Sequence, residues 1–193
     1  MESEQSLVKE CIRGNQKACE ALYYRYAGRL LSICLRYIPQ QDVAEDVLQE
    51  TFIKVFQHLP SFEFRNKGAL QAWMTRIIVN QALNYLRNKD KSLHLIDLET
   101  VNPMKIKHPD NSTENFNSLD TDEIHRCIGR LADGYRTVFN LYIFEDYSHK
   151  EIASLLEITE STSKTQLLKA RALLKKYMEE TLNRKKVLQH YGS

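Results

Sequence analysis

The chain is poor in the residues that interrupt helices. Its 193 residues include only six glycines and four prolines. The chain instead contains many Leu, Lys, Glu and Gln, which have a high helix propensity. No run of alternating polar and apolar residues is long enough to indicate a sheet. This composition predicts an all-α protein, and the length allows one or two domains.

The sequence also lacks segments that would enter a membrane. The first ten residues, MESEQSLVKE, do not have the basic and then apolar order of a signal sequence. No apolar run is long enough to span a bilayer. We therefore expect a cytoplasmic protein with no direct membrane insertion.

The four cysteines are not arranged as metal ligands. None belongs to a C-x-x-C pair, and no cysteine and histidine cluster has zinc spacing. Cys11, Cys19 and Cys34 lie among apolar helical positions, which predicts buried free thiols in a reducing compartment.

Motifs for catalysis are missing as well. There is no nucleophile elbow and no glycine-rich phosphate loop, and the six histidines are scattered. His149 is interpreted as a surface residue at a helix start. We predict no catalytic residue, no metal and no cofactor.

Net charge is small, at +2, but the charges are segregated. From Lys164 to Lys186 there are eight Lys and Arg against two Glu. From Asn88 to Asp122 there are four Lys against seven Asp and Glu. A basic C-terminal end suits a polyanionic partner, whereas the acidic middle does not.

The segment Asp146–Met178 has the features of a helix-turn-helix. Ser148 and Glu151 have the spacing of a capping box, and Thr159 is placed to cap a second helix with a basic outer face. Such turns often have glycine where this chain has Glu157, a residue that resists positive φ, so we expect a turn that is looser or built differently. The alternative interpretation is an ordinary helical hairpin with a solvated basic face.

The rest of the chain divides into further helices and a connector. A short helix stops near Gly14, and Asn15 is placed to cap the next one. Asp42 is expected to cap a helix that Pro60 ends, and a further helix follows a loop over 61–68. The predicted organisation is a helical domain over 1–90, a flexible linker over 91–120 and a helix-turn-helix domain over 121–185.

One helix face is acidic and rich in glutamine. A solvated surface is the usual meaning of such a face. A di-metal helical bundle would need Glu-x-x-His motifs, which this chain lacks. A docking face for a basic partner helix is the third interpretation. The face consists of Asp42, Asp46, Gln49 and Glu50.

The loop 61–68 and the helix after it mix aromatic residues with Arg and Asn. This combination suits single-stranded nucleic acid, because rings stack on bases while Arg and Asn bond to base edges. Taken alone, Phe62, Phe64 and Trp73 are interpreted as core residues.

Two segments resemble a known family. DVAEDVLQETFIKVFQHLPSF with GALQAWMTRIIVNQALNYLR is similar to the second conserved region of extracytoplasmic-function (ECF) sigma factors. LADGYRTVFNLYIFEDYSHKEIASLLEITESTSKTQLLKARALL is similar to their fourth region. The resemblance implies a sigma factor that binds core RNA polymerase and directs initiation at specific promoters. It also implies an anti-sigma factor as a partner, which in this family is often membrane-bound.

The resemblance implies three sets of binding residues. The acidic face, Asp42, Asp46, Gln49 and Glu50, would dock on a coiled coil of the largest polymerase subunit. The minus-ten set, which would hold melted promoter DNA, is Phe64, Arg65, Asn66, Lys67, Trp73, Arg76, Asn80 and Arg87. The minus-thirty-five set, which would read duplex promoter DNA, is Ser161, Thr162, Lys164, Thr165, Gln166, Lys169 and Arg171.

Two rival functions remain open from the residues. A helix-turn-helix regulator acting without core polymerase would explain Asp146–Met178 but leaves the acidic face without a role. A small helical enzyme would need an assembled nucleophile, base or metal set, which the sequence does not offer.

Overall fold

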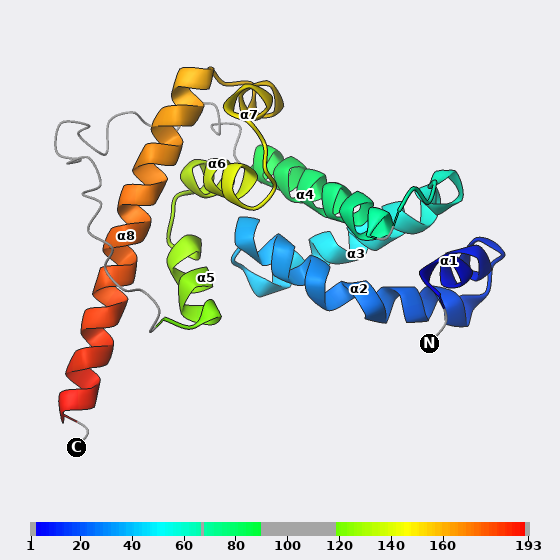
Figure 1. Ribbon diagram of the computed structural model, residues 1–193, viewed down its shortest axis with the longest axis horizontal. Helices are drawn as coiled ribbons and strands as arrows, with labels where there is room; N and C mark the ends of the chain where they lie inside the picture. The colour runs from blue at the N-terminus through cyan, green and yellow to red at the C-terminus, as the bar shows by residue number, and fades with distance from the viewer. Residues whose placement is uncertain (1–2, 67, 90–118, 192–193) are drawn as a thin grey trace. The chain divides into compact units, whose positions relative to one another are not determined.

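The computed structural model describes residues 3–66, 68–89 and 119–191, with side chains described up to Val187. The chain divides into two compact units, Met1–Lys89 and Asp90–Ser193. All regular elements in the described residues are helical, as the composition predicts (Figure 1). None of the helices in these ranges is both long enough and apolar enough to span a membrane.

The first unit contains α1 (Glu4–Ile12), α2 (Gln16–Tyr37), α3 (Gln41–His58), a short 3-10 turn η1 (Leu59–Ser61) and α4 (Ala69–Lys89). The α2 helix packs against α1, α3 and α4, and α3 also packs against α4. The apolar stripes of these amphipathic helices meet in one core. Its fully buried side chains include Leu22, Leu30, Val55, Leu70, Met74 and Ile78.

Helix ends in this unit only partly follow the sequence signals. The Asn15 side chain caps α2 as expected, accepting from the amide of Ala18. The prediction that Asp42 caps α3 is wrong, because the N-cap is Gln40, without a side-chain cap bond. Asp42 instead lies in the first turn, where its carboxylate faces the positive end of the helix dipole.

The expectation of three free thiols is corrected for two of them. Cys11 and Cys19 form a disulfide that joins the end of α1 to the start of α2. The turn at Gly14 brings the two residues together, with their Cα atoms 5.0 Å apart. Cys34 is free and buried as expected, and burial raises the pKa of its thiol to about 12.

The second unit contains α5 (Thr121–Gly129), α6 (Asp133–Ile143), α7 (His149–Leu156) and α8 (Glu160–Tyr191). The long α8 packs against each of the other three, and α6 also packs against α7. Its core is formed by apolar side chains from all four helices and from the junction between α5 and α6. They include Ile128, Leu131, Leu141, Ile152 and Ala170.

A buried arginine fixes the junction between α5 and α6. The Arg136 guanidinium donates to the carbonyls of Leu131 at 2.6 Å and Gly129 at 3.3 Å. It also pairs with Asp133 at 2.5 Å. The bond to Gly129 satisfies a carbonyl in the last turn of α5, which has no partner within the helix itself. The bonds to Leu131 and Asp133 hold the turn that follows.

Candidate polymerase and nucleic-acid interfaces

The acidic face lies on the solvent side of α3. Asp42, Asp46, Gln49 and Glu50 are all exposed. Their spacing of four, three and one residues puts them on one side of the helix. Ile53 lies at the next position of the same stripe and is 58% exposed. Sequence reasoning missed Ile53 because an isoleucine inside a helix is normally a core residue.

The acidic face is connected to α4 through a polar network. Lys54 donates from Nζ to Oε1 of Gln81 at 2.6 Å, and Gln81 donates from Nε2 to Glu50 at 3.4 Å. Gln81 is only 8% exposed, so its amide is held between the two helices. A cavity of about 600 Å³ beside this network is lined by both Glu50 and Arg87. One residue of the predicted docking face and one of the minus-ten set therefore line the same cavity.

Aromatic rings hold the loop before α4 against that helix. Phe62 lies 5.0 Å from Phe64 in an edge-on arrangement and 5.0 Å from Trp73 in a tilted one, measured between ring centroids. All three side chains are half-buried. The three rings are therefore neither fully buried, as core residues would be, nor fully exposed, as a surface for base stacking would be.

The minus-ten residues of α4 share one face of the helix. Trp73, Arg76, Asn80 and Arg87 follow each other at spacings of three, four and seven residues, which keeps them aligned. The last three are exposed. In the loop, Arg65 and Asn66 are exposed and Phe64 is half-buried, while Lys67 lies outside the described residues.

The helix-turn-helix has the caps that the sequence predicts. Ser148 and Glu151 form a reciprocal capping box at the start of α7. Thr159 accepts a hydrogen bond from the amide of Thr162 at the start of α8. The expectation of a looser or differently built turn is wrong at Glu157, which adopts the left-handed conformation with φ 56° and ends α7.

The minus-thirty-five residues do not all lie on the accessible side of α8. Ser161, Lys164 and Arg171 are exposed, and Thr162 and Thr165 are half-buried. Gln166 and Lys169 are only 8% and 3% exposed. The Lys169 ammonium lies 6.0 Å from the centre of the Tyr135 ring. The assignment of Gln166 and Lys169 as DNA readers stays a prediction. It requires both side chains to become accessible.

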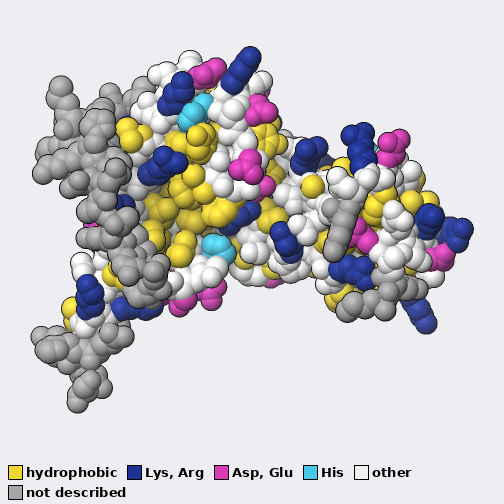
Figure 2. Space-filling view, viewed as in Figure 1, with side chains coloured by type: hydrophobic (Ala, Val, Ile, Leu, Met, Phe, Trp, Pro, Cys, Tyr) yellow, Lys and Arg dark blue, Asp and Glu magenta, His cyan; other side chains and the backbone are white. Residues whose placement is uncertain are grey.

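The accessible side of α8 also contains an apolar residue. Leu168 is 41% exposed and lies between Lys164 and Arg171 on the helix. Figure 2 shows Lys, Arg and His side chains at the margin of a hydrophobic patch in this part of the second unit. A surface of this kind can contact both phosphates and thymine methyl groups.

His149, at the start of α7, contributes a ring to this surface and is not a fully exposed residue. Its imidazole stacks on Tyr142 at a centroid distance of 4.6 Å, and its Nδ1 is 2.9 Å from Oγ of buried Ser163. Burial and the nearby Lys164 charge lower the pKa of His149 below its ordinary value of 6.5. The ring is therefore mainly neutral at pH 7.

The described residues contain no group of three or more side chains that could hold a metal ion. The candidate sites are helix surfaces with charged, amide and aromatic groups. Such surfaces suit binding to a macromolecule.

Comparisons with known proteins identify both units. Residues 22–92 match the family model of sigma-70 region 2, and residues 121–174 match that of sigma-70 region 4. The chain is 29% identical over 188 residues to the RNA polymerase sigma-H factor of Pseudomonas aeruginosa, covering 94% of this chain and 96% of that protein.

A second relative covers as much of the chain. The ECF RNA polymerase sigma-E factor of Escherichia coli K12 is 30% identical over 193 residues, covering 94% of this chain and 97% of the relative. Among solved structures, the sigma factor RpoE of Bartonella quintana, in complex with the anti-sigma factor NepR, is 21% identical with a TM-score of 0.49. It covers 83% of this chain and 96% of that one. By its two matched regions and its near full-length relatives, the chain belongs to the ECF sigma factors of bacterial RNA polymerase.

Proposed function

We propose that this protein binds core RNA polymerase and directs it to specific promoters in the cytoplasm. The observation that carries the proposal is the presence, in one chain and in order, of both sigma-70 DNA-recognition regions. Members of this family recognise DNA and dock on polymerase, so no catalytic step is assigned to this chain. From family membership we also propose regulation by an anti-sigma factor.

The proposal gives each surface its own contact. The acidic face of α3 docks on a basic coiled coil of polymerase, since opposite charges favour correct encounter. Melted minus-ten DNA is held by the exposed Arg and Asn side chains of α4 together with the aromatic loop. Flipping one base out of the stack there costs a few kcal/mol of unstacking free energy. The accessible side of α8 enters the major groove of the minus-thirty-five element.

In vitro transcription tests the function directly. Purified protein is added to core polymerase with a genomic DNA library, and transcript starts are mapped. We expect starts downstream of one shared pair of promoter elements. Starts that do not depend on added protein, or DNA binding that is sequence-specific without polymerase, would favour the rival helix-turn-helix regulator.

The docking face has its own test. Asp46→Lys with Glu50→Lys should reduce capture by immobilised core polymerase at least about tenfold, because like charges then face each other. Both side chains are exposed, so helix content measured by circular dichroism should stay the same. Undiminished capture of a folded double variant would contradict this assignment.

A further inference from the structure

Three side chains from three helices meet beside the accessible side of α8. Tyr142 comes from α6, His149 from α7 and Arg171 from α8. The His149 and Tyr142 rings are nearly parallel, with 25° between their planes. The Arg171 guanidinium carbon lies 5.8 Å from the centre of the Tyr142 ring. This distance is within the range of a cation–π contact.

The histidine end of this cluster is fixed. His149 Nδ1 is 2.9 Å from Ser163 Oγ, and Ser163 is completely buried in the first turns of α8. The Ser163 bond sets the plane of the imidazole, and the stacking then restricts the Tyr142 ring. Tyr142 is half-buried, so one part of its side chain is packed and another is accessible.

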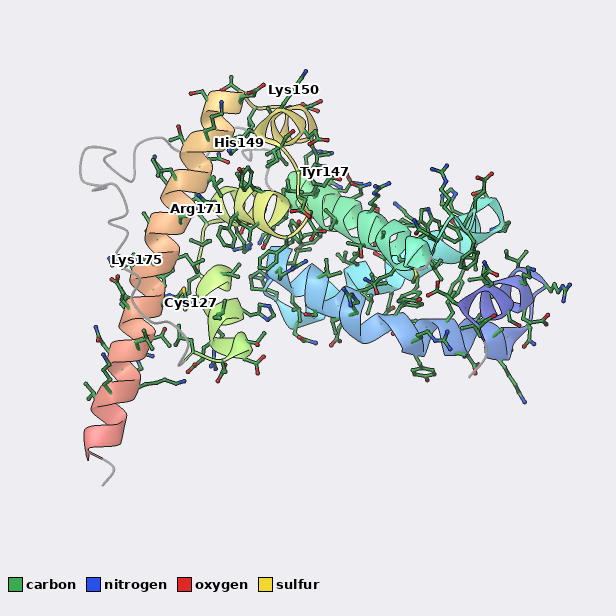
Figure 3. All side chains as sticks on the ribbon, viewed as in Figure 1. Cys127, Tyr147, His149, Lys150, Arg171 and Lys175 are labelled. Carbon is green, nitrogen blue, oxygen red and sulfur yellow. A yellow bond between two sulfur atoms is a disulfide. The ribbon has the colours of Figure 1, made fainter. Side chains whose placement is uncertain are left out.

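The arginine end of the cluster is exposed. Arg171 has no carboxylate within ion-pair distance in the described part of the chain. Figure 3 labels Arg171 on α8 and His149 on the neighbouring α7. An unrestrained arginine loses rotamer freedom when it binds a ligand. Contact with a fixed ring restricts the conformations of the arginine side chain before binding. Less conformational entropy is then lost when the ligand binds.

The position of Arg171 along α8 indicates which part of DNA it meets. In a helix-turn-helix the N-terminal residues of the second helix contact base edges. Arg171 lies eleven residues after the start of α8 at Glu160, or about 16 Å further along at 1.5 Å per residue. A guanidinium beyond the base-reading turns of such a helix is placed for the phosphate backbone.

We propose that Tyr142 is a positioning residue that holds Arg171 toward a backbone phosphate of the minus-thirty-five element, with His149 fixing Tyr142. The inference rests on the proposed function of α8 as the DNA-reading helix. It adds two residues, Tyr142 and His149, that lie outside the predicted minus-thirty-five set.

The test uses holoenzyme assembled from the full chain and core polymerase. The probe is a labelled promoter duplex selected by wild-type holoenzyme from a random library. Affinity is measured across a KCl series for wild type, Arg171→Ala, Tyr142→Leu, the double variant and Tyr142→Phe. Each lost phosphate contact lowers the slope of log affinity against log salt by about one.

The proposal expects Arg171→Ala and Tyr142→Leu each to weaken binding about five- to tenfold, with a smaller salt slope for Arg171→Ala. Tyr142→Leu should add less than about twofold in the Arg171→Ala background, because coupled residues are not additive. Tyr142→Phe keeps the ring and should restore affinity to within about twofold of wild type.

Additive losses in the double variant would overturn the positioning role while leaving the proposed function intact. If Tyr142→Leu does not fold, exposed Arg171→Lys decides the question, since lysine keeps the charge but not the planar contact. The proposal then expects weaker binding at an unchanged salt slope, and wild-type affinity would overturn it. Wild-type holoenzyme that selects no DNA sequence would overturn the proposed function and this inference together.

Discussion

Glu123 shows how single charged residues stabilise the second unit. One of its carboxylate oxygens accepts hydrogen bonds from Lys185 at 2.5 Å and from the amide of Asp120 at 2.9 Å. The amide of Glu123 donates in return to the Asp120 carboxylate, which completes a capping box for α5. The Lys185 bond, followed by the Asp120 amide, lowers the pKa of Glu123 below its ordinary value of 4.5.

This lowered pKa predicts a pH dependence of stability. A carboxyl group with a depressed folded-state pKa stabilises the fold above its unfolded pKa, and the effect disappears as pH falls through the folded value. Glu123→Gln keeps the capping box but removes the charge, so it should lower the melting temperature by about 2–4 °C at pH 7. The difference from wild type should shrink below the ordinary glutamate pKa, measured by thermal unfolding from pH 7 to pH 3. A difference that is constant over this range would contradict the role of the charge.

Other side chains show what the sequence could not predict at this scale. The apolar surroundings of Cys11 and Cys19 indicate burial, but not that a turn brings the two sulfurs into bonding distance. Gln166 and Lys169 are polar and flank the apolar stripe of α8. Packing against other parts of the chain, such as Tyr135 for Lys169, decides whether such flanking positions are accessible.

At the scale of elements, α3 combines a packed face with a docking face. Ile53, 58% exposed, lies within the acidic stripe and continues the spacing of Asp46 and Gln49. An apolar side chain surrounded by polar ones resembles the centre of a protein interface, where few residues supply most of the binding energy.

Ile53 should therefore be needed for polymerase binding. Ile53→Asp is expected to weaken affinity for core polymerase at least about tenfold, measured by fluorescence anisotropy with labelled protein. Tyr24→Asp is the matched control, because Tyr24 is 79% exposed on α2 in the same unit. Equal affinities of the two variants would show that Ile53 has no special part in docking.

The helices themselves were predictable because each buries an apolar stripe with helical spacing. Capping signals gave the starts of α2, α7 and α8, since an Asn, Ser or Thr side chain bonds locally to the helix amides. The start of α3 was missed because Gln40 makes no side-chain cap bond that the sequence could signal. The conformation of the turn at Glu157 was not predictable for a related reason. Its positive φ ends α7 where the amide of Ile158 bonds to the carbonyl of Ala153, and no glycine marks the place.

At the scale of the whole molecule, the two units, Met1–Lys89 and Asp90–Ser193, are parts of one covalent chain. Each unit has its own buried core, and each contains one of the matched sigma-70 regions. A covalent connection makes the second DNA contact intramolecular once the first has formed. The gain depends on effective concentration, which for linked modules reaches the millimolar range.

This connection predicts that the separated units cannot replace the intact chain. An equimolar mixture of fragments 1–89 and 119–193 should support at least about tenfold less transcription than full-length protein at the same concentration, because 119–193 must then find the promoter complex unaided. Run-off transcription with core polymerase measures this, and circular dichroism checks that each fragment is helical. Raising the concentration of 119–193 should restore part of the activity, since mass action replaces the lost tether. Full activity of the dilute mixture would mean that the minus-thirty-five contact contributes little to initiation, or that the fragments associate without the connecting residues.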